Sequence, residues 1–548
     1  MTATQLKEIM NELNMKDITY KIVDGYNNSY VEISQEINGI NTEFIISFPI
    51  GFPYQFPEIR VKGEEYKNLP HIDKKTGKLC LFNQEAIPNP KMPIEVINES
   101  INKARNIIYD GLNGFNKEDF IDEFHAYWIS DEDTLGNIDV FFEPLNEVKR
   151  VKCIYSKDYS FWCCGDNYNE LIEYAKKNCQ EELVVEDAIY IPMSEKIYPP
   201  FPHTNKEFYN ILSKSENGRE YKKFLTNRKG NPIVLFSQED KGRYILSCII
   251  HTGIYDIKKG FRKGKIAPDV AYRIVYPDNK VLKFTTEIIN RKRLFYRGGD
   301  GNMIDKKVSI LGCGSLGGYL AQALTELGVN DIKLVDDENL RKENIARHIC
   351  GIDFVDMNKT EAIKRKLTSH YIGLKIENYS NNIYSLITNN IEELSDRDIQ
   401  FVAVGDMALE SYIIDKYNKG ELKGKIVIVW VEPYAIGGHA IILNKPQDNI
   451  EQCIYSDNWK LKNRILEKPE IFTKKEAGCQ STFVQYSGFE ANYFIRTLLD
   501  NIINGKLLND KNYFITIAGK IDWARENQIE ITSKWLSAKN RTVNIEEL

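Results

Sequence analysis

The stretch that decides the fold runs from Lys307 to Glu338 and reads KVSILGCGSLGGYLAQALTELGVNDIKLVDDE. A short apolar run stops at a glycine, a helical pattern follows over residues 315–328, and a second apolar run closes the stretch. Strand, helix and strand in this order predict a βαβ unit with two parallel strands. Two later apolar runs, DIQFVAVG and GKIVIVWVEPY, predict further strands of the same sheet.

A glycine-rich loop joins the first strand to the helix. Gly312, Gly314 and Gly317 fit the pattern G-x-G-x-x-G. Glycines let the backbone approach a phosphate, and a helix N-terminus offers free N–H donors and the positive end of its dipole. An acidic cluster ends the next strand, at the distance expected of a ribose-binding carboxylate: Asp336, Asp337 and Glu338. By itself the loop predicts a nucleotide site, with an NAD enzyme as the default and a structural turn as the alternative.

Residues beyond the acidic cluster favour a triphosphate over a hydride carrier. Asn344 and Arg347 follow in ENIARH, then comes Lys359, and Asp406 follows the run FVAVG. Arginine and lysine would neutralise phosphate charge as pyrophosphate leaves, and Asp406 would hold Mg²⁺ through carboxylate oxygens. Each charge alone is better explained as a solvated surface residue, so the argument depends on the ordered set.

This ordered set resembles the motif of the ubiquitin-activating enzymes and their bacterial relatives, the ThiF/MoeB-like adenylating enzymes, over about residues 290–540. The resemblance implies that Glu338 takes the ribose, that Arg347 and Lys359 contact phosphates, and that Asp406 binds the metal. The matching residues are Gly312, Gly314, Gly317, Asp336, Glu338, Asn344, Arg347, Lys359 and Asp406.

The chain also departs from that motif. Glu338 stands where the family has a second aspartate, Met407 stands where it has an asparagine, and the paired C-x-x-C zinc site of small bacterial members is missing. Members of the family usually dimerise through this domain and donate an arginine to the partner's site. Three arginines could serve, and the sequence does not choose among them: Arg291, Arg293 and Arg297.

A candidate nucleophile, Cys479, lies in KKEAGCQSTFVQYSG, after a long polar stretch over residues 444–478 and before a helical pattern. Connections this long inside a compact domain tend to be functional or mobile. A thiolate near a helix N-terminus and lysines has a lowered pKa and can attack an acyl-adenylate. Activating enzymes carry such a cysteine on a crossover loop, so the resemblance implies that Cys479 accepts the acyl group as a thioester. The alternative is a buried, inert thiol.

The first region of the chain has a different residue pattern, with short alternating runs and several prolines. Two alternating runs, YVEISQEI and TEFIISFP, predict antiparallel strands, FPIGFPYQFPEIRV ends in a third strand, and residues 94–112 have helical spacing. Cys80 follows in GKLCLF, after His71. With Pro53 and Pro57 in the turn, the region resembles a ubiquitin-conjugating enzyme, which implies that Cys80 is its catalytic cysteine.

The His-Pro-Asn segment of that family is incomplete here, because Ile72 and Asp73 follow His71. An ionised Asp73 cannot donate a hydrogen bond, so the role of stabilising the oxyanion is unassigned. The alternative is an RWD-like module, which has the same fold and proline turn but no catalytic cysteine.

Composition limits the class of protein. Lys and Arg number 72 and Asp and Glu 78, a formal net charge of −6, which argues against a general nucleic-acid coat. No run approaches the ~18 apolar residues of a membrane helix, and no secretory signal is recognisable, so we expect a cytoplasmic protein without a membrane partner. The ten cysteines, none in a C-x-x-C pair, are then expected to be thiols.

The predicted fold class is a multidomain combination of α/β and α+β: a ubiquitin-conjugating-like α+β domain over residues 1–140, an α+β connecting domain over 141–290, and a Rossmann-like ThiF adenylation domain over 291–548. This order resembles the bacterial fusion enzymes of CBASS antiphage systems, which join a CD-NTase (a cGAS-like nucleotidyltransferase) through its C-terminus to a target.

The resemblance implies an enzyme that uses ATP and Mg²⁺ to activate a partner ending in glycine or alanine, relays it from Cys479 to Cys80, and conjugates it to lysines of acceptor proteins. It also implies a homodimer through the C-terminal domain and no nucleic-acid partner. Three rivals remain: a sulfur-carrier adenylyltransferase with a non-catalytic N-terminal module, an NAD-dependent oxidoreductase, and a non-catalytic scaffold.

Overall fold

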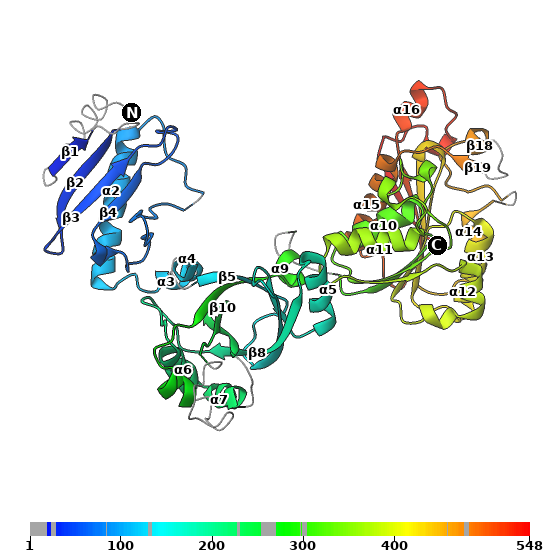
Figure 1. Ribbon diagram of the computed structural model, residues 1–548. Helices are drawn as coiled ribbons and strands as arrows, with labels where there is room; N and C mark the ends of the chain where they lie inside the picture. The colour runs from blue at the N-terminus through cyan, green and yellow to red at the C-terminus, as the bar shows by residue number, and fades with distance from the viewer. Residues whose placement is uncertain are drawn as a thin grey trace. The chain divides into compact units, whose positions relative to one another are not determined.

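The computed structural model describes residues 19–23, 29–83, 85–129, 134–226, 231–253, 270–295, 298, 304–456, 459–475 and 482–548. The chain divides into two compact units, Met1–Ile289 and Asn290–Leu548, which are described separately below (Figure 1). None of the described helices is long and apolar enough to span a membrane. All nine cysteines in the described ranges are free thiols.

The first unit opens with an antiparallel sheet whose described strands follow the chain order: β1 (Thr19–Val23), β2 (Tyr30–Ile37), β3 (Ile40–Ser47) and β4 (Glu58–Lys62). Alternate residues of these strands, such as Ile33 and Phe44, turn inward and pack against α2 (Pro93–Asn113). Helix α2 begins with a proline, whose missing N–H has no helical partner to lose, and ends at Gly114 with a φ of 71°. The predicted antiparallel strands and the helix are thus confirmed.

Two short helices, α3 (Asp119–Asp122) and α4 (Phe124–Ile129), follow this sheet and pack on the next part of the unit. Trp128 of α4 is fully buried, stacks edge-on against Phe201 and Phe236, and donates from Nε1 to the carbonyl oxygen of Phe284 at 3.0 Å. Residues near the end of the ubiquitin-conjugating-like region are therefore part of the core that follows it.

That core belongs to a closed barrel with the strand order β10-β11-β5-β7-β6-β8-β9 (Figure 1). β5 lies inside the range predicted for the first domain, yet it pairs in parallel with both β11 and β7 of the barrel. The remaining elements of this unit are β5 (Thr134–Val140), β6 (Lys149–Ser156), β7 (Trp162–Gly165), α5 (Tyr168–Asn178), β8 (Leu183–Met193), α6 (Asn205–Lys214), α7 (Gly218–Thr226), β9 (Ile233–Asp240), β10 (Arg243–Ile250), a π-helical turn (Ala271–Val275) and β11 (Leu282–Ile288).

The second unit is built on an open sheet with the order β14-β13-β12-β15-β16-β17-β20-β21. The strands from β14 to β16 are parallel, and β17, β20 and β21 continue the sheet antiparallel. The strands are β12 (Lys307–Leu311), β13 (Asp331–Val335), β14 (Lys375–Tyr379), β15 (Ile399–Val402), β16 (Lys425–Val431), β17 (Gly437–Leu443), β20 (Tyr513–Ala518) and β21 (Val543–Glu547).

Helices cover both faces of this sheet. One apolar cluster joins it to α10 (Ser315–Glu326), α11 (Lys359–His370) and α15 (Gly488–Asn504), and a second joins it to α12 (Ile383–Asn389), α13 (Met407–Asn418) and α14 (Ile450–Ile454). α9 (Arg291–Phe295), α16 (Ile521–Glu526) and a two-stranded hairpin of β18 (Thr473–Lys475) and β19 (Thr482–Val484) complete the unit. The result is a doubly wound α/β fold, as predicted.

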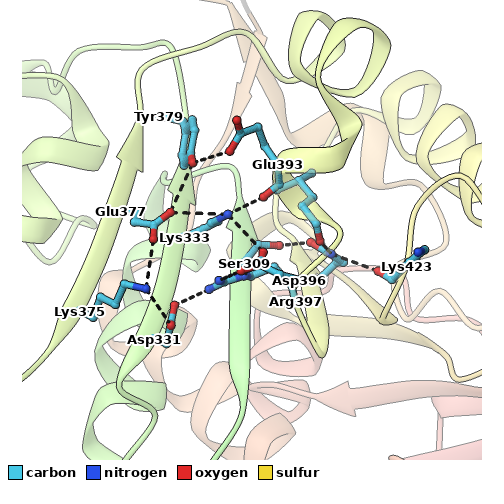
Figure 2. A network of polar contacts seen from close by, with 12 residues as sticks. Ser309, Asp331, Lys333, Lys375, Glu377, Tyr379, Glu393, Asp396, Arg397 and Lys423 are labelled. Atoms are coloured by element: carbon cyan, nitrogen blue, oxygen red, sulfur yellow. Dashed lines mark hydrogen bonds and ion pairs between the residues drawn. The ribbon is translucent and has the colours of Figure 1, made fainter.

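A network of polar side chains lies on the α12–α13 face of the sheet (Figure 2). Ser309, Lys333 and Gln400 are register neighbours on β12, β13 and β15, and all are buried. Lys333 donates from Nζ to the carbonyl oxygen of Glu393 at 2.5 Å, and the buried Arg397 forms ion pairs with Asp331 and Asp396. Because Asp331 opens β13 and Arg397 precedes β15, this network gathers toward the amino ends of the strands.

Candidate functional site

The strand order has one switch point, between β12 and β15. The chain leaves β12 to build β13 and β14 on one side, and β15 and β16 on the other. In open parallel sheets, ligands bind beyond the carboxyl ends of the strands at such a point. Gly312 follows β12 and Asp406 lies just beyond β15, so the fold brings the predicted glycine loop and the predicted metal ligand to this edge.

The loop's glycines have different structural roles. Gly312 has a φ of 91°, and a Cβ there would lie 2.7 Å from the carbonyl oxygen of Ala403. A Cβ on Gly317 would lie 1.9 Å from the carbonyl oxygen of Gly312, so the loop and helix could not approach each other. A Cβ on Gly314 would meet no described atom within 4 Å. Gly314 therefore faces open space, where it precedes the unpaired amides of the first turn of α10.

Asp336 organises the glycine loop from within. Its Oδ2 accepts a hydrogen bond from the Cys313 amide at 2.7 Å and its Oδ1 accepts one from the Glu338 amide at 2.9 Å. The residue is 8% exposed, and burial raises the pKa of its carboxyl group, although the Lys359 charge opposes this. Both of its oxygens are therefore engaged by the chain itself.

Glu338 has the more accessible carboxylate of the two. Its side chain is 71% exposed and forms an ion pair with the buried Lys359 of α11. The backbone supports this pair, because the Lys359 amide donates to the carbonyl oxygen of Glu338 at 3.0 Å. A ribose hydroxyl or a phosphate at this edge would thus contact the Glu338 carboxylate and the Lys359 ammonium, which are already paired with each other.

Arg347 connects the helix after the glycine loop with the β18–β19 hairpin. Its Nη1 donates to the carbonyl oxygen of Val484 in β19 at 3.2 Å, and its guanidinium lies 5.0 Å from the ring centre of Tyr486. Its own carbonyl oxygen accepts from Ser315 Oγ at 2.6 Å. Cys479 comes between the two strands of the hairpin in sequence and lies outside the described residues.

Asn344 lies three residues before Arg347 and shapes the turn that leads to it. Its Oδ1 accepts from the Arg341 amide at 3.1 Å, which closes the short 3-10 turn Lys342–Asn344. The carbonyl oxygen of Asn344 accepts from the Arg347 amide at 3.0 Å, so Asn344 shapes the chain on both sides of this turn.

Asp406 begins α13 as its N-cap. Its Oδ1 accepts from the amides of Ala408 and Leu409 at 2.9 Å and 3.3 Å, and the residue is exposed. One turn later, Glu410 is 8% exposed and has no hydrogen-bond partner for its Oε1 among the described residues. Burial, with the Asp406 charge, raises the pKa of Glu410 to about 7, while the Gly405 amide bonds its carboxylate.

This pair of carboxylates fits Mg²⁺. Oxygen donors are the ligands that Mg²⁺ prefers, and it is commonly held by one or two carboxylates together with substrate phosphates. The unpartnered Glu410 oxygen is a candidate ligand that sequence reasoning missed. Its only sequence signal is a second acidic residue four positions after Asp406, which places both at the start of one helix.

The three arginines that were candidates to complete a partner's nucleotide site do not lie at the described part of this edge. Arg291 donates from Nη2 to the carbonyl oxygen of Val329 at 2.9 Å, just before β13, and so lies toward the amino edge of the sheet. This hydrogen bond lies at the edge of the sheet opposite the glycine loop. Arg293 belongs to the same short helix α9, and Arg297 lies outside the described residues.

In the first unit, Cys80 is exposed at the end of a small turn of chain. Its amide donates to the carbonyl oxygen of His71 at 2.8 Å, and Ile72 bridges to Leu79. Asp73 accepts from the amide of Thr76 at 2.7 Å and from its hydroxyl at 2.5 Å. Asp73 therefore closes the turn and does not supply an oxyanion donor.

His71 is held between two carboxylates. Its Nδ1 lies 3.0 Å from Glu123 Oε1 and its Nε2 lies 3.0 Å from Asp119 Oδ2. The hydrogen bond to Glu123 raises the pKa of His71 to about 9, so at neutral pH an imidazolium donates to both acids. Glu123 also accepts from the Tyr127 hydroxyl at 2.9 Å.

The thiol of Cys80 responds to the same surroundings. Although Cys80 is exposed as a residue, partial burial of its thiol raises the pKa, the Glu123 charge raises it further, and Lys78 lowers it. Sequence reasoning missed Asp119 and Glu123, which lie 48 and 52 positions from His71. Only their spacing of four residues could have suggested that they share one side of a helical segment.

Comparison with known proteins finds a family match within each unit. Residues 291–521 match the ThiF family, and residues 11–135 match prokaryotic E2 family B. The ATP-dependent ubiquitin transferase-like protein Cap2 of Pseudomonas aeruginosa (strain BWHPSA011 / Pa011) is 23% identical over 467 residues, which cover 79% of each chain. The protein of the same name from Vibrio cholerae serotype O1 is 38% identical over 71 residues, 12% of each chain.

Among solved structures, E. coli MccB with ATP is 20% identical and covers 46% of this chain and 73% of its own, with a TM-score of 0.30. E. coli MccB with AMPCPP and MccA is 21% identical and covers 42% of this chain, with a TM-score of 0.28; the present chain spans only 63% of that protein. The two family matches confirm the predicted fusion of a conjugating-like domain with an activating-like domain.

Proposed function

From a chain that carries a prokaryotic E2 family B domain and a ThiF-family domain, we propose an enzyme that attaches the C-terminus of a partner protein to lysines of other proteins. ATP-dependent adenylation and ubiquitin-like conjugation are the activities that these two kinds of domain carry. The identity of the partner, the route of the acyl group and the residues below are parts of the proposal.

The first step takes place at the carboxyl edge of the second unit's sheet. ATP binds with its phosphates at Gly312–Gly317 and the N-terminus of α10, Glu338 takes the ribose, and Arg347 and Lys359 offset phosphate charge. Asp406 and Glu410 would hold Mg²⁺, which supplies charge neutralisation when bound. A carboxylate oxygen of the partner's C-terminus attacks the α-phosphorus, an acyl-adenylate forms, and pyrophosphate leaves.

The acyl group then moves along two thiols. The Cys479 thiolate attacks the acyl-adenylate carbonyl, forming a thioester and releasing AMP. Exchange with the Cys80 thiolate transfers the acyl group and restores the Cys479 thiol. The amine of an acceptor lysine attacks the Cys80 thioester, which gives an isopeptide bond and frees Cys80.

The partner we propose is a CD-NTase, or another protein that ends in glycine or alanine, and the setting is antiphage defence. This follows from the order of the domains and from the similarity to Cap2 over 79% of the chain. We also propose a homodimer through the ThiF-family domain, in which one of the α9-region arginines completes the partner's nucleotide site. The position of Arg291 at the opposite edge of its own sheet supports this.

The observation that carries the proposal is the convergence at one sheet edge. The glycine loop, the Glu338–Lys359 pair and Asp406 meet around the switch point between β12 and β15, in a chain that also presents an exposed Cys80. A dinucleotide enzyme needs the loop and an acidic residue, but it does not need Lys359, Asp406 or Cys80.

A non-reducing gel tests the relay. The full chain is mixed with Mg·ATP and a candidate CD-NTase, beside Cys479→Ala, Cys80→Ala and, as a matched control, the exposed Cys453→Ala. We expect an ATP-dependent band that thiol reagents remove, absent in Cys479→Ala. Cys80→Ala should keep the first thioester and lose conjugates, and Cys453→Ala should behave as wild type.

Other outcomes favour the rivals. Conjugates that persist in Cys80→Ala would exclude the relay, and adenylate without Cys80-dependent conjugates would indicate a sulfur-carrier adenylyltransferase. Nicotinamide binding that is indifferent to Lys359→Ala would indicate an oxidoreductase. No ATP-dependent thioester with a verified partner would leave a scaffold.

A further inference from the structure

His348 follows Arg347 directly in the chain and is buried beside the glycine loop, with 6% of its surface exposed. Its Nδ1 lies 3.1 Å from the amide nitrogen of Cys350, and its Nε2 lies 2.9 Å from the carbonyl oxygen of Cys313. An amide can only donate and a carbonyl can only accept. Nδ1 therefore accepts, and Nε2 carries the proton and donates to Cys313.

The surroundings keep this ring neutral. Burial lowers the pKa of His348, and the charges of Lys359 and Lys366 lower it further, although the hydrogen bond to the Cys313 carbonyl raises it. A proton on Nδ1 would oppose the Cys350 amide, so the observed contacts fit only the neutral ring with hydrogen on Nε2. The ring thus links two backbone segments, accepting a hydrogen bond from Cys350 and donating one to Cys313.

The carbonyl that His348 holds belongs to the peptide between Cys313 and Gly314. A trans peptide is planar, so its C=O and N–H point in opposite directions. Asp336 already holds the amide of Cys313 on the preceding peptide. With its carbonyl anchored by His348, the next peptide presents the Gly314 N–H away from the imidazole.

Without this anchor the peptide would be free to turn. Glycines flank Cys313 on both sides, and glycine adopts a wider range of backbone angles than any other residue. Gly314 itself faces open space at the start of α10. A rotated Cys313–Gly314 peptide would place a carbonyl oxygen where a phosphate needs a donor, and the two would repel.

We propose that His348 is a positioning residue for nucleotide binding, whose Nε2–H orients the Cys313–Gly314 peptide so that the Gly314 amide faces the phosphates of ATP. This rests on the proposed function of the same site. His348 does not touch the nucleotide, so its effect passes through the loop. The glycine pattern alone does not reveal it, because the residue is 35 positions away from Cys313.

Two conservative substitutions separate the two hydrogen bonds. In His348→Gln the amide nitrogen reaches the position of Nε2 and can donate to Cys313. In His348→Asn the amide oxygen reaches the position of Nδ1 and can accept from Cys350, but nothing reaches Cys313. Binding of Mg·ATP to the full chain is measured by isothermal titration calorimetry, and melting temperatures are measured beside it.

We expect His348→Gln to bind Mg·ATP within about threefold of wild type and His348→Asn to bind it about tenfold more weakly, the loss of roughly one net hydrogen bond. Gln400→Leu is the matched control. It removes a buried polar side chain near the amino ends of the same strands, so it should lower the melting temperature without changing ATP affinity.

Two results would overturn the proposal while leaving the nucleotide site intact: His348→Asn binding as tightly as wild type, or His348→Gln as weakly as His348→Asn. If Gln400→Leu weakens ATP binding as much as His348→Asn does at equal loss of melting temperature, the effect is general destabilisation and the proposal fails. Absence of ATP binding by the wild-type chain would instead refute the proposed function.

Discussion

At the scale of single residues, Cys80 has a thiol that its neighbours hold in the protonated form. Burial and the Glu123 charge raise its pKa, and the Lys78 charge lowers it. A protonated thiol is a poor nucleophile, because the thiolate is the reacting species. In the proposed relay, Cys80 would therefore react slowly with general electrophiles and would depend on an activated thioester to acquire the acyl group.

Two substitutions should shift its reactivity in opposite directions. Both are made in a His71→Gln background, because Glu123 keeps His71 charged and its removal would otherwise cost the imidazolium charge as well. In that background Glu123→Gln should speed alkylation of Cys80 at pH 8 by about threefold, whereas Lys78→Gln should slow it by about twofold, since a tenfold change corresponds to one pKa unit. Iodoacetamide labelling followed by mass spectrometry of the Cys80 peptide measures both. Equal rates in the two variants would show that neither charge acts on the thiol.

His71 predicts a pH dependence of stability. Its pKa is raised from 6.5 to about 9 in the folded chain by the hydrogen bond to Glu123. A raised pKa means that the folded state binds the proton more tightly, so the contribution is complete below pH 6.5 and is lost as pH rises through 9. Its size is on the order of 3 kcal/mol, at about 1.36 kcal/mol for each pKa unit.

The measurement is the melting temperature of the full chain between pH 6 and pH 10, for wild type and His71→Gln. Wild type should lose stability across the window from 6.5 to 9, and the difference between the two proteins should shrink toward zero above pH 9. A difference that is constant with pH would mean that His71 is not charged between its two carboxylates.

At the scale of elements, the buried ion pairs of Figure 2 tie the loop before β15 to the sheet. The Arg397 side chain is 1% exposed and pairs with Asp331 and Asp396. Arg397→Ala removes a buried cation from two carboxylates, of which Asp331 keeps Lys375 and Asp396 keeps Lys333. It should therefore destabilise the chain by about 2 kcal/mol, between the cost of a broken buried pair and that of an exposed one. The site lies at the other edge of the sheet, so its affinity for Mg·ATP should remain within about twofold of wild type.

Urea unfolding of the full chain measures the loss of stability, with Lys511→Ala as the control. The Lys511–Glu547 pair is about half exposed on both sides, and such pairs contribute roughly 0.5 kcal/mol or less. A small effect of Arg397→Ala, similar to that of Lys511→Ala, would mean that Lys333, Lys375 and water compensate the two acids without Arg397. A loss of ATP binding would mean that the network also supports the nucleotide site.

An element can be predicted from sequence when the interactions that form it join residues close together in the chain. The βαβ unit from Lys307 to Glu338 and helix α2 follow from apolar periodicity within a few turns of chain. The barrel does not, because β5 pairs in parallel with β11, and Thr285 bonds to Asn137 across 148 positions. The partners of His71 and Cys313 are non-local in the same way, so motif spacing finds Cys80 and the glycine loop but not the residues that hold them.

At the scale of the whole molecule, the chain combines adenylation with conjugation, and only one of these two activities depends on the other. Conjugation requires an activated acyl group, so it cannot proceed when adenylation stops. In the proposed relay, adenylation requires only the second unit's nucleotide edge and the partner's C-terminus, so it does not need Cys80. Variants at the two sites should therefore have asymmetric effects, which a rival with a single active site would not show.

Asp406→Asn and Cys80→Ala test this asymmetry. Asp406→Asn removes a charge at the edge where the triphosphate would bind, so it should lower partner-dependent ATP–pyrophosphate exchange about 100-fold, the size of loss typical for a group that stabilises developing charge, and conjugate yield should fall with it. Cys80→Ala should leave exchange within about twofold of wild type and abolish conjugates. Radiolabelled pyrophosphate exchange measures the first activity and a denaturing gel the second. If Cys80→Ala also stopped exchange in a folded protein, the two units would not be successive steps of one relay, and the first unit would have to take part in the activation itself.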